Sequence, residues 1–169
     1  MLINRIVCRS ADWKEGSAGV NPFGQSFILS KTNILLFISQ HTEARFKYIF
    51  RLGANELALG DIANQHKIIA NETFNLLDGE EFYGLRYRGE KGEVIGGWLS
   101  FIKRSNGIVY FSFLGRSGYF DSPNKDQLEK LRDHMVSLLN NIGIHADADE
   151  EPGEITIRVD LNSCERPVS

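Results

Sequence analysis

Four histidines are the first candidates for acid–base chemistry in this chain of 169 residues: His41, His66, His134 and His145. No two of them are spaced as HxH or HxxxH, the spacings that bring two side chains to one strand face or one helical face. A general base also needs a group that orients it, and the sequence offers Glu43 beside His41, or Asp121 if the fold brings it close. One hypothesis is therefore an enzyme whose site is assembled from dispersed histidines and acids: His41, His66, Glu81 and Asp121.

Motifs that would define a cofactor site or a nucleophile do not occur in the sequence. The 16 glycines include no GxGxxG or Walker spacing, and the densest group, in residues 89–97, is explained by a turn and a bulge. Gly115-Arg-Ser-Gly118 is one residue short of a nucleophile elbow. Cys8 and Cys164 have neither CxxC spacing nor a neighbouring histidine, so we expect free thiols. We predict no catalytic residue, no cofactor and no metal site.

The composition is that of an ordinary globular domain. Hydrophobic residues make up 42% of the chain, charged residues 24%, and the net charge is −3. Long disorder is therefore not expected, and a dedicated nucleic-acid binder would usually carry a basic surplus. The N-terminus holds no run suited to a signal peptide, and the longest apolar run, 34–38, is too short to span a membrane. We expect a cytoplasmic protein without membrane association, with one domain over residues 1–161 and a polar tail over 162–169.

The centre of the predicted fold is an antiparallel meander of three strands, over residues 82–88, 93–104 and 108–114. Asn106 and Gly107 are expected to form a two-residue hairpin loop, which pairs Ile102 with Phe111. Because side chains alternate along a strand, this register predicts one core-facing set. That set is Tyr83, Leu85, Tyr87, Val94, Trp98, Ile102, Val109, Phe111 and Phe113.

A long amphipathic helix is predicted over residues 123–142, because its apolar side chains recur on one face. They are Leu128, Leu131, Met135, Leu138, Leu139 and Ile142. Further strands are expected over 2–8, 26–30, 34–38, 45–52, 56–59 and 154–161, with 147–154 as a solvated acidic loop. Residues 60–81 give a poor signal, with a strand at 66–70 or a helical turn at 72–77 as options. The total is about eight strands, and the fold class is α+β. The sheet is mostly antiparallel, either bent or a partial barrel, with the long helix packed on one face.

Basic residues concentrate in the predicted meander. Residues 86–116 contain six bases and two acids. On the predicted register, bases alternate with aromatic residues on the outward face of the sheet. The residues expected to contact a partner are Arg86, Arg88, Phe101, Lys103, Tyr110 and Arg116. Arg45, Lys47 and Arg51 would extend this surface if their strand lies next to the meander.

Arginine and tyrosine among apolar neighbours are typical of protein interfaces. The sequence therefore favours a small non-catalytic interaction protein, of the inhibitor, immunity or adaptor type, that binds a protein partner through this face. A single-stranded nucleic-acid binder on the same face is the first alternative, since bases can stack on aromatics while lysine and arginine contact phosphates. The enzyme with dispersed histidines and acids is the second.

Overall fold

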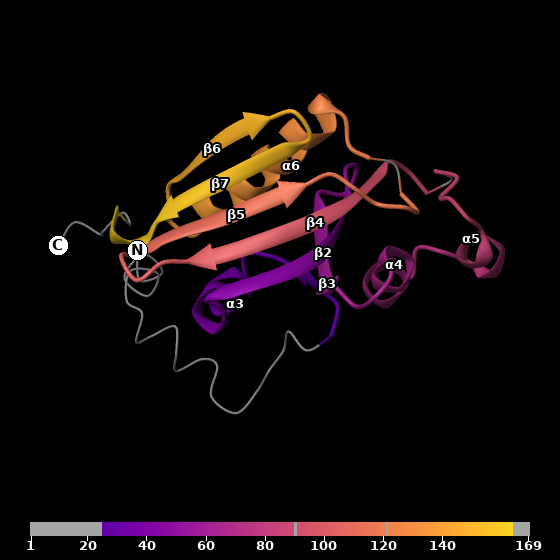
Figure 1. The fold of residues 1–169 in the computed structure, drawn as a ribbon, viewed down its shortest axis with the longest axis horizontal. Helices are drawn as coiled ribbons and strands as arrows, with labels where there is room; N and C mark the ends of the chain where they lie inside the picture. The colour runs from indigo at the N-terminus through magenta and orange to yellow at the C-terminus, as the bar shows by residue number, and fades with distance from the viewer. Residues whose placement is uncertain (1–24, 90, 121, 164–169) are drawn as a thin grey trace.

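A computed structural model describes residues 25–89, 91–120 and 122–163 of the chain. These residues form a seven-stranded antiparallel sheet in the order β1-β3-β2-β4-β5-β7-β6, with helices packed on it (Figure 1). The predicted α+β class and the bent antiparallel sheet are confirmed. The two end strands of the sheet are not paired with each other, so the sheet is open. The strand expected at 2–8, both cysteines, Asp121 and residues 164–169 lie outside the described residues.

The elements follow one another along the chain as several antiparallel hairpins with helical insertions. The strands are β1 (Phe27–Leu29), β2 (Glu43–Arg51), β3 (Glu56–Asp61), β4 (Val94–Lys103), β5 (Ile108–Leu114), β6 (Ala146–Glu151) and β7 (Glu154–Asp160). The helices are α3 (Ile34–Gln40), α4 (His66–Phe74), α5 (Gly79–Tyr83) and α6 (Lys125–Asn140), with a 3₁₀ turn, η1, at Leu161–Ser163. No helix in the described part of the chain is long and apolar enough to cross a membrane.

One face of the sheet carries the main hydrophobic core, covered by α3 and α6. Helix α6 confirms the predicted helix, with Leu131, Met135 and Leu139 fully buried against the sheet. Its N-terminus is closed by a capping box between Asn124 and Gln127, which satisfies two backbone N–H groups that lack helical partners.

Helix α3 covers the other half of the core face. Its residue Phe37 contacts the rings of Phe46, Phe101 and Phe111, which lie on three neighbouring strands. Residues 34–38 were predicted as a strand, and this prediction is wrong. A short run that is apolar on every side fits a buried helix as well as a buried strand. The Asn33 side chain accepts from the Ser30 N–H and donates to the Ile28 carbonyl, so it holds the turn between β1 and α3 without capping the helix.

The opposite face of the sheet is only partly covered in the described residues. Helix α4 packs there over one end of β2 and β3, where Ile69 and Ala70 join Ile49 and Ala58 in a second, smaller core. Residues 66–70 are therefore helical, and the strand proposed for them is wrong. The other end of this face carries no covering element among the described residues, and it extends over β2, β4, β5, β7 and β6.

The β4–β5 hairpin differs from the prediction by one residue. Its loop has three residues, 105–107, in which Gly107 takes a φ of 88° and the Gly107 N–H bonds the carbonyl of Arg104. Ile102 therefore pairs with Tyr110, and Phe101 pairs with Phe111. A shift of one residue moves every β4 side chain to the other face. Phe101 is consequently buried in the core, and Trp98 points outward.

Two further segments differ from the prediction. Residues 82–88 are not a strand: α5 ends at Tyr83, and Tyr83 and Leu85 are 84% and 91% exposed. Residues 147–154 are not a loop, because β6 pairs with β7 from Ala146 to Glu151. Acidic residues are unusual in strands, but here they lie on an edge strand, where charge discourages pairing with another chain.

Candidate binding face

The uncovered end of the sheet carries three rows of side chains that run across five strands. We call this surface the open face. Residues paired in register share a face, so the pairings give its rows directly. The first row is Glu43, Ile102, Tyr110, Arg158 and Asp147. The second row is Arg45, Ser100, Ser112, Thr156 and Asp149. The third row is Lys47, Trp98, Leu114, Glu154 and Glu151.

Large side chains stand on both sides of a row of small ones. Ser100, Ser112 and Thr156 occupy the middle of the second row, and the Ser112 and Thr156 hydroxyls lie 3.3 Å apart. Trp98 and Leu114 lie in the row on one side, and Tyr110 lies in the row on the other. Leu114 is 41% exposed. The centre of the open face therefore combines exposed apolar surface with short polar groups.

Trp98 is held between two basic residues of β2. The Arg45 guanidinium lies 5.7 Å and the Lys47 ammonium 5.3 Å from the centre of the indole ring. Lys47 is also anchored, since its Nζ donates a 2.7 Å hydrogen bond to the carbonyl of Asn64. These contacts orient the indole and both cations before any partner arrives.

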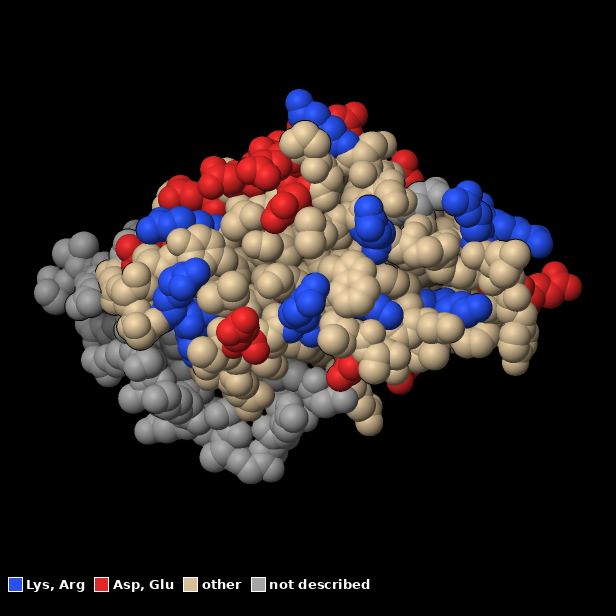
Figure 2. All heavy atoms as spheres, in the orientation of Figure 1, with Lys and Arg blue, Asp and Glu red and all other residues tan. Residues whose placement is uncertain are grey.

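Charge on the open face is divided between its two sides. Basic residues Arg45 and Lys47 come from β2, while Asp147, Asp149 and Glu151 come from β6 at the opposite edge. Figure 2 views this face and shows acidic side chains gathered over β6, with basic side chains spread over the strands below. The second and third rows are therefore dipolar across the strands, whereas the first row has an acid at both ends, Glu43 and Asp147.

The six residues predicted to contact a partner are not brought together by the fold. Tyr110 lies on the open face, where Arg104 packs 5.8 Å from its ring centre. Phe101 is fully buried between Phe37 and Phe111, so its prediction as a contact residue is wrong. Lys103 lies on the core side of β4.

The Lys103 Nζ donates to the carbonyls of Ile38 and Ser39 at the C-terminal end of α3, at 2.8 and 3.4 Å. It therefore has a structural role, since a cation at this end of a helix satisfies unpaired carbonyls. The other three residues predicted as contacts, Arg86, Arg88 and Arg116, are exposed in loops and not on strands.

The residues of the open face that best fit a binding role were either not predicted as contact residues or predicted as such only under a condition. Arg45 and Lys47 were expected to extend the surface only if their strand lay beside the meander, and β2 does pair with β4. Trp98 was placed in the core because the hairpin loop was taken as two residues long. The glycine that ends the loop, Gly107, was the available signal, because three-residue hairpins place glycine in the left-handed position.

The histidines lie apart from one another in the described structure. His41 packs between Phe37 and Phe46, its Nδ1 donates to the Phe37 carbonyl at 2.8 Å, and burial lowers its pKa. Burial also lowers the pKa of His134, which lies against Phe50. These environments keep both imidazoles neutral and fixed in the fold.

His66 lines a cavity in the described part of the chain. This cavity, of about 270 Å³, lies at the start of α4 and is lined by Lys47, Gln65, His66, Lys67, Gly84, Leu85, Gly118 and Tyr119. The His66 Nε2 donates to the Gly97 carbonyl at 2.9 Å, and burial lowers its pKa. Lys67 donates to the Phe82 carbonyl at 2.7 Å. Of the residues named for the enzyme hypothesis, the described lining of this cavity includes His66 and neither His41 nor Glu81, while Asp121 lies outside the described residues.

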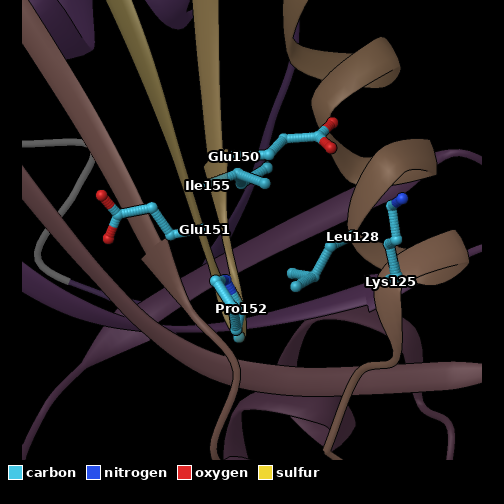
Figure 3. Close-up of a pocket in the computed structure, with 7 residues that line it drawn as sticks. Lys125, Leu128, Glu150, Glu151, Pro152 and Ile155 are labelled. Carbon is cyan, nitrogen blue, oxygen red and sulfur yellow. The ribbon is translucent and has the colours of Figure 1, made fainter.

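A larger cavity, of about 580 Å³, lies between the start of α6 and the β6–β7 hairpin. Figure 3 shows Glu150 pointing toward α6, where it pairs with Arg132, and Glu151 pointing away from the helix. The buried side chains of Leu128 and Ile155 line it, and no described histidine or cysteine does. The cavity therefore offers apolar contact but no chemistry that would define a substrate.

The sequence matches no family model, and comparison with curated proteins and with solved structures gives no similar protein.

Proposed function

We propose that this chain is a non-catalytic binding protein that docks another protein on the open face of its sheet. The observation that carries the proposal is the partly exposed Trp98, flanked by Arg45 and Lys47 on the end of the sheet face that no described element covers. Tryptophan and arginine are the residues most enriched among binding hot spots. The inhibitor, immunity or adaptor role expected from the sequence is one form that such binding would take.

The charge distribution favours a protein over a nucleic acid. A surface that tracks a phosphate backbone needs continuous positive charge. The open face instead places Asp147, Asp149 and Glu151 on the same surface as its bases. Opposite charges on the two sides of a surface that also exposes apolar side chains match the complementary arrangement that proteins present to each other.

The proposal is tested by affinity capture from lysate of the source cell, using a tagged chain with and without nuclease. The test variant is Arg45→Glu with Lys47→Glu. The matched control is Lys125→Glu with Lys130→Glu, which makes the same charge change on exposed positions of α6. We expect a nuclease-resistant protein that is lost with the test variant and kept with the control.

Two results would count against the proposal. A captured protein that binds both variants equally would place binding elsewhere on the molecule. Bound material that disappears with nuclease, and whose binding weakens steeply with salt, would favour the nucleic-acid alternative.

A further inference from the structure

In two of the three rows of the open face, charges of opposite sign lie symmetrically about the central strand. In the order β2, β4, β5, β7, β6 the middle strand is β5, with the basic strand two places to one side and the acidic strand two places to the other. Arg45 and Asp149 share a row, and Lys47 and Glu151 share the next. We infer that the partner of the open face is a second copy of this chain, packed face to face about a two-fold axis parallel to β5. This inference rests on the proposed function, because it names the protein that the open face binds.

The symmetry fixes which residues meet. A two-fold axis that runs along β5 between two stacked sheets places β5 over β5, β4 over β7 and β2 over β6, and it keeps each row opposite itself. Arg45 then faces Asp149 of the second copy, and Lys47 faces Glu151 of the second copy. Each contact occurs twice in the dimer. In the described structure none of Arg45, Asp149 and Glu151 forms an ion pair within its own chain, so these charges remain for a partner.

The strands nearest the axis combine apolar and polar side chains, with the small polar residues Ser100, Ser112 and Thr156 in the middle row. Tyr110 and Leu114 lie on β5 and meet their own counterparts near the axis, while Trp98 on β4 lies over Glu154 on β7 of the second copy. Stacked sheets lie about 10 Å apart with strands within about 30° of alignment. The outer strands β2 and β6 lie about 10 Å from the axis. There the long side chain of Arg45 can extend toward the second copy, while Lys47 has to release its hydrogen bond to the Asn64 carbonyl to do so.

One row contains an unfavourable pair. Glu43 of one copy faces Asp147 of the other, and both are acidic. The Arg158 guanidinium lies 3.9 Å from the Asp147 carboxylate in the same chain and partly neutralises it. Two favourable charge pairs therefore oppose one unfavourable pair on each side of the axis.

The size of the open face sets the strength expected of the dimer. Five strands about 4.8 Å apart and three rows about 7 Å apart give a flat area of about 500 Å². Stable interfaces bury about 800 Å² per partner, so we expect a dimer that dissociates on dilution. The charge contacts are solvent-accessible at their edges and should weaken as salt screens them.

Sedimentation velocity on the full chain, from low micromolar to several hundred micromolar protein, tests this dimer. We expect a concentration-dependent dimer for the unmodified chain. Arg45→Glu with Lys47→Glu makes both sides of the open face acidic, and Asp149→Lys with Glu151→Lys makes both sides basic. Each of these double variants should be monomeric at concentrations where the unmodified chain is a dimer.

Mixing the two variants provides the decisive step. In an equimolar mixture the acidic chain meets the basic chain, every reversed pair is again opposite in charge, and a mixed dimer should form. The quadruple variant that carries all four changes should dimerise with itself. Recovery of association would also show that the variants are folded.

An unmodified chain that stays monomeric at several hundred micromolar overturns the dimer. So does a dimer that persists in both double variants, or a mixture of the two variants that does not associate. The proposed function would survive the first result if lysate capture still gave a different protein that depends on Arg45 and Lys47. It would fail together with the dimer only if that capture also failed.

Discussion

The Lys47 ammonium lies 5.3 Å from the centre of the Trp98 ring, its cross-strand neighbour on the open face. Arg45 approaches the same ring at 5.7 Å. An indole held in place by two cations loses little conformational freedom when a partner docks, which is the condition for strong binding by a single aromatic residue.

Trp98→Ala is therefore expected to weaken binding by at least tenfold, corresponding to about 1.4 kcal/mol or more. Its effect on the free energy of unfolding should stay within about 1 kcal/mol, because the side chain is partly exposed on an uncovered face. Sedimentation and lysate capture measure the binding, and urea unfolding measures the stability. Unchanged binding by a folded Trp98→Ala chain would show that the open face is not the contact surface.

Lys103 and Arg45 should respond differently to charge reversal. Lys103→Glu removes the donor to the Ile38 carbonyl and places an anion at the C-terminal end of α3, so we expect a loss of about 1–2 kcal/mol in stability. Arg45→Glu should cost less than about 1 kcal/mol, because Arg45 is exposed. Urea unfolding of the two variants makes the comparison. Equal losses would mean that Lys103 does not act as a helix cap.

Gly97 is expected to tolerate no side chain. A Cβ at this position would lie 1.9 Å from the Leu114 carbonyl oxygen and 2.8 Å from the Tyr48 ring. The register of β2 with β4 runs without interruption through Gly96 and Gly97, so the bulge expected here is absent and close packing explains the glycine. Gly97→Ala should lower the free energy of unfolding by about 2–4 kcal/mol.

The matched control for Gly97→Ala is Gly53→Ala, because nothing lies within 4 Å of a Cβ at Gly53 and its φ is not positive. We expect a change within about 0.5 kcal/mol for this control. Thermal or urea unfolding of both variants is the measurement. A small loss at Gly97 would contradict the close approach of β5 to this glycine.

Glu81 carries a buried carboxyl group with no hydrogen-bond partner among the described residues. The residue is 4% exposed, and both carboxyl oxygens are inaccessible. Glu81→Met should therefore raise the free energy of unfolding by about 1–3 kcal/mol, because an unsatisfied buried polar group is removed. The exposed neighbour provides the control, since Glu80→Met should change stability by less than about 0.5 kcal/mol. A loss of stability at Glu81 would indicate that its carboxyl group has a partner in solution.

Acid is expected to destabilise the fold through its buried histidines. Burial lowers the pKa of His134 below 6.5, and the unfolded chain therefore takes up a proton before the folded chain does. The contribution of the neutral His134 side chain to the free energy of unfolding is complete above about pH 6.5 and is lost as the pH falls below that value. His134→Leu should reduce the slope of stability against pH by up to about 1.4 kcal/mol per pH unit. Urea unfolding between about pH 7.5 and about pH 5.5 measures that slope, and an unchanged slope would contradict the expected titration.

Elements with a sustained hydrophobic period were predictable from the sequence. The apolar side chains that form the stripe of α6 point into the main core, and so do the alternate apolar side chains of β2 and β7. The hydrophobic pattern of these elements therefore matches their burial. The strand prediction for residues 34–38 failed because their pattern has no polar side, so it fits a buried helix as well as a buried strand. Strand β6 was not predicted because a segment with four acids in six residues resembles a loop. Only its pairing with β7 makes this segment a strand.

The prediction of the candidate site depended on the length of the β4–β5 hairpin loop. With a two-residue loop at Asn106 and Gly107, Trp98 is placed in the core and Phe101 outward; with the observed three-residue loop the two exchange. Both faces of β4 are apolar enough to be buried, so hydrophobicity alone could not choose between them. The basic residues of the open face were predictable from the sequence. Its acidic half was not predictable, because the acidic residues reach this surface only when β6 joins the same sheet.

The occupant of the open face can be measured most directly by site-specific photo-crosslinking. A benzoylphenylalanine at Ser100, in the middle row, is compared with one at Asp126 on the exposed side of α6, followed by mass spectrometry of the crosslinked peptides. We predict strong crosslinking from position 100 alone, to peptides of β5 and β7 of a second copy. Crosslinking that is no stronger at position 100 than at position 126 would contradict a binding role for the open face.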